Sequence, residues 1–303
     1  MQPLTITRRA AIAAAFAPFA SALPLDKVAL GVTTDEIDED VEVAAAFLKE
    51  FKLHWAEVRN IWGKYNTAQP VDRVKDARAI FDKHGIRTSI LGTGFFKIPL
   101  PPDTREGRAV LDNQWSLLDG AFERAKVLGT DKLRIFAFTH GKGETPAAGN
   151  YPRIHELVTE AARRAKQRGV RLAVENVGES YVWSGAQAAA FLKNVKHESV
   201  GLTWDPNNAA TTGEKSFPDG YKTIDPARIM HVHLRDFRKG ADGKFEWCAV
   251  GAGEMDNLGQ IRMLLKSGYK ESFTLETHYK DPLGKAHASR TSLNSLLKVF
   301  SAV

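Results

Sequence analysis

Three acidic residues and one histidine stand at the ends of short apolar runs that lie far apart in the chain. Glu175, Asp205 and Glu276 directly follow such runs, and His233 lies near the end of another. Burying three carboxylates together is unfavourable unless a cation compensates their charge. Carboxylate oxygens with one imidazole nitrogen suit a divalent ion such as manganese, magnesium, cobalt or zinc. If the fold gathers these four side chains, the sequence predicts a metal site.

The elements that must position these residues alternate regularly from residue 28 onward. Short apolar or β-branched runs are each followed by a longer helical period, which is typical of parallel strands joined by crossover helices. The eight predicted strands are Val28–Thr33, Trp55–Asn60, Arg87–Gly92, Lys132–Phe138, Arg171–Val177, Val200–Asp205, Ile229–Arg235 and Ser272–Thr277. The eight predicted helices are Val41–Phe51, Val71–His84, Arg105–Leu128, Tyr151–Arg168, Gly185–Val195, a poorly formed Pro218–Ile224, Asn257–Ser267 and Gly284–Val303.

Glycines separate several predicted helices from the strands that follow them. They occupy the position where a left-handed cap ends a helix, and they are Gly85, Gly129, Gly169 and Gly268. No Gly-x-Gly-x-x-Gly follows the first strand, and eight similar units favour a closed α/β barrel over an open, doubly wound sheet. We therefore expect a single-domain (β/α)8 TIM barrel over residues 23–303, with its active site at the C-terminal ends of the strands.

Two histidines compete for one metal position on the seventh predicted strand. His231 and His233 are two residues apart, so their side chains point to the same side of the strand. His233 lies nearer the C-terminal mouth and is the expected ligand. His231 lies one layer deeper, where it either meets the substrate or orients another group, or is a hydrogen-bonded core histidine.

Further polar residues lie at or just past strand ends and are candidates to contact a substrate. They are Glu57, Arg59, Trp62, His140, Lys239 and His278. For Glu57 and Arg59 the alternative is a structural ion pair with each other. Aromatic side chains in strand-to-helix loops, namely Trp62, Phe95, Phe96 and Trp183, would either stack on a sugar ring or pack between loops. The glycine-rich stretch from Phe237 to Glu254 is expected to form a lid.

The first 22 residues differ in composition from the rest of the chain. Arg8 and Arg9 precede an uncharged, alanine-rich run that ends in Ala20-Ser21-Ala22, which is the pattern of a twin-arginine export signal. We therefore expect export, to a periplasm, of a mature form without a membrane segment. The alternative is an amphipathic N-terminal helix.

Composition and charge exclude several classes of protein. The chain has 303 residues, 43% of them hydrophobic, 26% charged and only one cysteine, with a formal net charge of +6. This composition is globular and gives no internal disulfide, so Cys248 is expected to be a structural thiol. Basic residues are scattered among acidic ones, which does not favour nucleic-acid binding. The expected partner is a small sugar, with a homo-oligomer as a further option.

Five motifs resemble the xylose isomerase-like TIM-barrel superfamily of sugar isomerases and epimerases, to which the family 2 AP endonucleases belong. The motifs are Val-Glu-Asn at 174–176, Trp-Asp-Pro-Asn-Asn at 204–208, His-Val-His-Leu-Arg-Asp at 231–236, Val-Gly-Ala-Gly-Glu at 250–254 and Leu-Glu-Thr at 275–277. The resemblance covers residues 28–300. It implies one divalent metal held by Glu175, Asp205, His233 and Glu276. It also implies that Glu175 and Glu276 shuttle a proton next to a carbonyl of a keto sugar or polyol.

The sequence also departs from the pattern of its relatives. Asn208 stands where many ketose epimerases and the AP endonucleases have a histidine, and it is suited to hydrogen-bond a substrate hydroxyl. A multi-zinc nuclease centre is therefore disfavoured. The main alternative to an isomerase or epimerase is a metal-dependent lyase or dehydratase of an oxidised sugar or glycoside. A non-catalytic sugar-binding barrel is the third reading.

Overall fold

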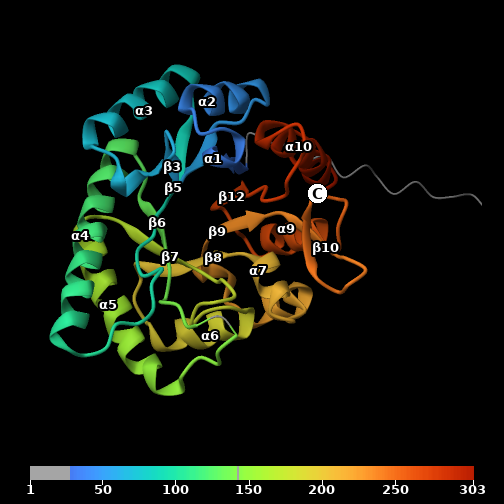
Figure 1. Ribbon diagram of the computed structural model, residues 1–303. Coiled ribbons are helices and arrows are strands. Elements are labelled where there is room, and N and C mark those ends of the chain that lie inside the picture. The colour runs from blue at the N-terminus through green and yellow to red at the C-terminus, as the bar shows by residue number, and fades with distance from the viewer. Residues whose placement is uncertain (1–27, 142) are drawn as a thin grey trace, which may run out of the picture.

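Eight parallel strands pair into a closed ring in the computed structural model, which describes residues 28–141 and 143–303 (Figure 1). Around the ring they are β1 (Ala29–Thr33), β12 (Ser272–Leu275), β9 (Ile229–Leu234), β8 (Val200–Trp204), β7 (Arg171–Glu175), β6 (Lys132–Ile135), β5 (Arg87–Gly92) and β2 (Trp55–Val58). The predicted TIM barrel is confirmed.

Helices cover the outside of this ring (Figure 1). The long ones are α2 (Val41–Glu50), α3 (Val71–His84), α4 (Arg105–Leu128), α5 (Tyr151–Gln167), α6 (Gly185–Asn194), α9 (Asn257–Lys266) and α10 (Lys285–Ser301). The shorter helices and turns are α1 (Thr34–Ile37), η2 (Asn66–Ala68), η3 (Ala148–Asn150), α7 (Pro206–Thr211), η4 (Ser216–Gly220), α8 (Tyr221–Thr223) and η5 (Pro226–Arg228). The expected glycine caps have left-handed φ angles of 71°, 71°, 68° and 85° at Gly85, Gly129, Gly169 and Gly268.

Two hairpins and one helix depart from the prediction. The loops after β2 and β9 carry antiparallel pairs, β3 (Asn60–Ile61) with β4 (Lys64–Tyr65) and β10 (Asp236–Lys239) with β11 (Phe245–Cys248). Helix α7 begins directly after β8 because the Asp205 side chain accepts hydrogen bonds from the backbone N–H groups of Asn207 and Asn208. The predicted helix Pro218–Ile224 is instead the irregular turn η4 followed by α8.

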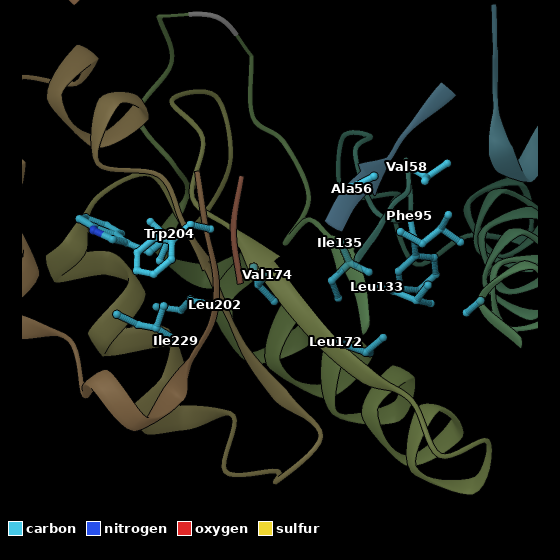
Figure 2. Close-up of a cluster of buried hydrophobic side chains, with 14 of the residues drawn as sticks. Ala56, Val58, Phe95, Leu133, Ile135, Leu172, Val174, Leu202, Trp204 and Ile229 are labelled. Carbon is cyan, nitrogen blue, oxygen red and sulfur yellow. The ribbon is translucent and has the colours of Figure 1, made fainter. Parts of the chain in front are cut away.

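Alternation along the strands separates an apolar outer layer from a polar interior. Leu133, Ile135, Leu172 and Val174 are fully buried and alternate with polar neighbours such as Arg134. Figure 2 shows these side chains with those of neighbouring strands in one buried cluster. The strands therefore turn their apolar side chains to the helices and leave the barrel interior to charged groups.

The ring closes where the first strand meets the last. β1 pairs with β12 in register from Ala29 with Ser272 to Val32 with Leu275, and α1 lies beside α10 (Figure 1). Lys285 Nζ donates to the carbonyl of Asp35 at 3.0 Å, and Ser289 Oγ of the same helix donates to the carbonyl of Glu36 at 2.8 Å. This seam joins segments from opposite ends of the described chain.

The predicted export segment, residues 1–22, lies outside the described residues. Among residues 28–141 and 143–303, no helix is both long and apolar enough to cross a bilayer. Cys248 is buried and unpaired.

Substituting Gly31 with alanine tests how tightly β1 packs against β2. An added Cβ would lie 2.5 Å from the carbonyl oxygen of Trp55 on the neighbouring strand, so the backbone must shift. We expect Gly31→Ala to lower the free energy of unfolding by about 1–3 kcal/mol, measured by thermal or denaturant unfolding. Gly94→Ala is the control, because a Cβ there meets no atom within 4 Å. If Gly31→Ala and Gly94→Ala were equally stable, the close packing of Gly31 against Trp55 would be contradicted.

Candidate metal centre

Four side chains converge at the C-terminal mouth of the barrel. Glu175 is the last residue of β7, Asp205 and Glu276 directly follow β8 and β12, and His233 is the fifth residue of β9. One ligand atom of each lies within 4.8 Å of one ligand atom of every other. All four residues are buried, with exposed fractions between 0% and 3%. These are the residues that the strand-end pattern singled out.

His233 turns one ring nitrogen, which has no hydrogen-bond partner among the described residues, toward the three carboxylates. Its Nε2 lies 2.8 Å from Glu57 Oε2, and an ionised carboxylate can only accept, so Nε2–H donates. Its Nδ1 is buried without a hydrogen-bond partner. This atom lies 3.5 Å from Glu175 Oε1, 3.7 Å from Asp205 Oδ2 and 3.4 Å from Glu276 Oε2.

Arginines bind the carboxylates from outside the cluster. Arg134 Nη1 donates to Glu175 Oε2 at 2.7 Å, and Arg59 Nη1 donates to Glu276 Oε1 at 2.9 Å. The other oxygen of each glutamate is the one that faces His233. Both glutamates are therefore held in orientation while one oxygen stays directed at a common point.

Asp205 is held by two kinds of contact. Its Oδ1 accepts from the backbone N–H groups of Asn207 and Asn208, each at 2.9 Å. Its Oδ2 accepts from Arg235, whose guanidinium group stacks on Trp247 of β11 with Cζ 4.2 Å from the ring centre. The hairpin that follows β9 therefore helps to hold a carboxylate of the cluster.

These contacts keep the glutamates ionised. Burial favours the neutral form of Glu175, but Arg134 and His233 together outweigh it and lower the pKa of this carboxyl to about 2. Burial likewise opposes ionisation of Glu276, but His278, His233 and Arg235 hold its pKa well below the usual range. The same competition, won by His233 and His231, lowers the pKa of Glu57. Burial opposes a charge on His233 as well, but Glu57 and Glu276 outweigh it and raise the pKa of the ring, so the ionised carboxylates are balanced by protein charges around them.

The donor set fits a divalent cation. His233 Nδ1, to which a cation would bind in place of a proton, and one oxygen from each of the three carboxylates would supply one nitrogen and three oxygens. A metal-binding histidine typically donates its other ring N–H to a carboxylate, as His233 does to Glu57. Glu175, Asp205, His233 and Glu276 are thus the residues that would hold the ion.

Two neighbouring groups of possible ligands are already neutralised by protein donors. Glu36, Glu276 and His278 form one group, but Arg59 donates to both Glu36 and Glu276 at 2.7 and 2.9 Å. Glu57, His231 and His233 form the other, and its members hydrogen-bond one another. In both groups, the possible ligand atoms are therefore already bonded to other protein groups.

The residues predicted to bind substrate fall into three places. Asn208, Arg59 and His278 lie at the mouth: Asn208 Nδ2 is 3.3 Å from Glu175 Oε1, and His278 Nε2 is 3.3 Å from Glu276 Oε1. Glu57 and His231 lie beneath His233 and are 0% exposed. Glu57 and Arg59 do not pair with each other, since Arg59 binds Asp35, Glu36 and Glu276.

The remaining candidates lie farther from the four converging residues. Trp62 packs under Arg73, whose Cζ is 3.8 Å from the ring centre. His140 and Trp183 line one hollow between loops, and Lys239 lines another beside the β10–β11 hairpin. Phe95 and Phe96 are fully buried against Trp115, so their role is packing.

Two arginines of the site were not predicted from sequence. Arg134 and Arg235 are 2% exposed and bind carboxylates of the cluster, Glu175 and Asp205. The available signal was strand alternation, because Arg134 shares the inward face of its strand with Lys132 and Arg235 follows His233 by two residues.

Comparison with known proteins supports this assignment of the fold. The family model for the xylose isomerase-like TIM barrel matches residues 45–299. No curated protein matches the chain. Many solved structures do, at identities where the likeness is one of fold.

Three of these structures contain a bound metal ion or sugar. The IolI protein with a bound zinc atom has a TM-score of 0.73 at 18% identity, covering 90% of this chain and 98% of that one. A xylose isomerase-like TIM-barrel protein from Mycobacterium smegmatis, in complex with magnesium, scores 0.65 at 17% identity and covers 91% and 97%. D-psicose 3-epimerase from Clostridium cellulolyticum H10, with D-tagatose, scores 0.67 at 16% identity and covers 91% and 96%.

Metal content tests the centre directly. We expect one divalent ion per chain by elemental mass spectrometry after incubation with manganese. His233→Ala and Glu175→Ala should weaken binding by at least about 100-fold, because losing a ligand costs more than losing an outer partner. His287→Ala is the control, since this exposed histidine pairs only with Asp281, at 3.0 Å. Unchanged metal content in both ligand variants would contradict the assignment.

Proposed function

Because the chain belongs to the xylose isomerase-like TIM-barrel family, we propose that it is a divalent-metal-dependent isomerase or epimerase of a keto sugar or polyol. The observation that carries this proposal is the pair of glutamates that face one cation point. Glu175 and Glu276 follow strands three places apart in a ring of eight. They therefore approach a bound substrate from different sides.

The proposed reaction is proton transfer at a carbon next to a carbonyl. A divalent ion at this point, when bound, would polarise the substrate oxygens and stabilise the negative charge that develops as the proton leaves. One glutamate removes the proton as a base. The other takes up a proton from solvent and delivers it, to the other face in an epimerase or to the neighbouring carbon in an isomerase.

The surrounding residues position these glutamates. Arg134 and Arg59 each bind one carboxylate oxygen and so fix the direction of the other. Asn208 donates to Glu175 and to the carbonyl of Asn176, and its amide is placed to bind a substrate hydroxyl. Trp247 covers Arg235 and shields the buried pair that Arg235 forms with Asp205.

The sugar class follows from two kinds of support. Solved structures with this fold include D-psicose 3-epimerase and a D-allulose 3-epimerase with its sugar bound. Hydroxyl-rich ligands also match the donors and acceptors at the mouth, which are Arg59, Asn208 and His278. A lyase would begin with the same proton abstraction. The two reactions are distinguished by whether the carbon is reprotonated or the product loses water or a leaving group.

Deuterium incorporation tests the chemistry. With manganese in D2O, we expect D-fructose, D-psicose or D-tagatose to gain one deuterium at the reacting carbon and to yield an isomer, followed by NMR. Glu175→Gln and Glu276→Gln should each lower turnover by about 10²-fold or more, and His287→Ala should not. Loss of water or of a leaving group would favour the lyase instead, and full activity of both Gln variants would overturn the two-glutamate mechanism.

We also propose that the protein is exported through a twin-arginine pathway, on the basis of Arg8, Arg9 and the alanine-rich run after them. Fractionation of a bacterial host should place the wild-type protein in the periplasm, shortened by about 22 residues at its N-terminus. Arg8→Lys with Arg9→Lys should retain it in the cytoplasm. Cytoplasmic, full-length wild-type protein would contradict export.

A further inference from the structure

A chain of buried polar side chains runs to His233 from the floor of the barrel, which is the end formed by the N-termini of the strands. It starts at Lys132, the first residue of β6, and passes through Ser272, His231 and Glu57. All four are buried, with exposed fractions of 6%, 2%, 0% and 0%. Lys132 belongs to β6 and Ser272 to β12, which are not neighbours in the ring, so this contact crosses the barrel interior.

The hydrogen bonds in this chain have one consistent direction. Lys132 Nζ can only donate, and it lies 3.3 Å from Ser272 Oγ. Ser272 Oγ lies 2.7 Å from His231 Nδ1, and His231 Nε2 lies 3.2 Å from Glu57 Oε2.

The carboxylate fixes the tautomer of His231. Because Glu57 can only accept, His231 must carry its proton on Nε2, and its Nδ1 must then accept the Ser272 hydroxyl proton. The donors of Lys132, Ser272 and His231 therefore all point in the direction of Glu57.

The last step of the chain reaches the metal centre. Glu57 Oε2 also accepts from His233 Nε2 at 2.8 Å, which leaves His233 Nδ1 as the bare nitrogen among the three carboxylates. Without the Ser272 hydroxyl, His231 Nδ1 would lose its hydrogen-bond donor, and the ring that donates to Glu57 would no longer be held in place from below. His233 would then lose the acceptor that orients its ring.

We propose that Lys132 and Ser272, at the opposite end of the barrel from the substrate, are positioning residues that set the orientation of His233 for metal binding. This inference rests on the metal-dependent function proposed above. Neither residue can contact the ion or the substrate. They act through His231 and Glu57, which connect the two ends of the barrel.

The floor of the barrel offers a matched control. Glu271 accepts from Lys132 Nζ at 2.8 Å and from Arg171 Nη1 at 2.6 Å. Arg171 also pairs with Asp131 at 2.9 Å, and its recorded side-chain bonds go only to these two acids. Arg171→Met therefore removes an ion pair from the same floor without entering the chain to His231.

The test is manganese binding to chelator-treated protein by calorimetry. We expect Lys132→Met and Ser272→Ala to raise the dissociation constant by about 10-fold, at the lower end of the effect of outer partners of metal ligands. Arg171→Met should remain within about 2-fold of wild type. Unchanged affinity in Ser272→Ala, or an equal loss in Arg171→Met, would overturn the inference.

Two further measurements keep the test decisive. Ser272→Ala removes a single hydroxyl group, so it serves if Lys132→Met fails to fold by circular dichroism. NMR of ring nitrogens in the zinc-loaded protein should show His231 protonated on Nε2 in both proteins, with the Nδ1 signal shifted in Ser272→Ala because that nitrogen loses its hydrogen-bond donor, and an unchanged Nδ1 signal would count against the inference. If the wild-type protein binds no manganese, the proposed metal-dependent function fails first, which is a different result.

Discussion

The repulsion among Glu175, Asp205 and Glu276 is the constraint on which the rest of the structure depends. Three carboxylates directed at one buried point are stable only if other charges compensate them. Arg134 and Arg59 bind the outer oxygens of the two glutamates, and Arg235 binds Asp205 through the oxygen that also faces His233. Such pairs stabilise little on balance, because removing both partners from water offsets their attraction. Their value here is orientation, since they keep the inner oxygens directed at a common point beside His233.

The same constraint explains why the barrel interior is polar. An ordinary TIM barrel fills its interior with layers of branched apolar side chains, and here the apolar residues of the strands mostly face the helices instead. A charged cluster at the mouth needs hydrogen-bonded partners below it, which Glu57 and His231 provide. Those residues in turn need partners, which are found at the floor. The polarity of the site therefore extends through the length of the barrel.

The sequence predicted the ring of strands and the four converging residues because both follow from periodicity. A residue that ends an apolar strand must lie at the mouth, as Glu175 and Glu276 do. Depth within the barrel was harder to predict, since it depends on the stagger of strands that are distant in sequence. Glu57 was expected at the substrate or in a pair with Arg59, and His231 at the substrate or one layer deeper; both lie beneath His233. Arg134 was overlooked because a lone arginine in a strand has no partner that is visible from sequence.

The seam between β1 and β12 places the last ligand beside the first segment of the barrel. Arg59 joins Glu276 to Asp35 and Glu36, so the two ends of the barrel must meet before this glutamate is fixed. On a ribosome, the strand that precedes Glu276 is the last of the eight to emerge. A growing chain therefore has no complete ion-binding site until synthesis is almost finished. Under the function proposed above, capture of the ion would therefore be a late, post-translational event, and truncation near the C-terminus would remove it altogether.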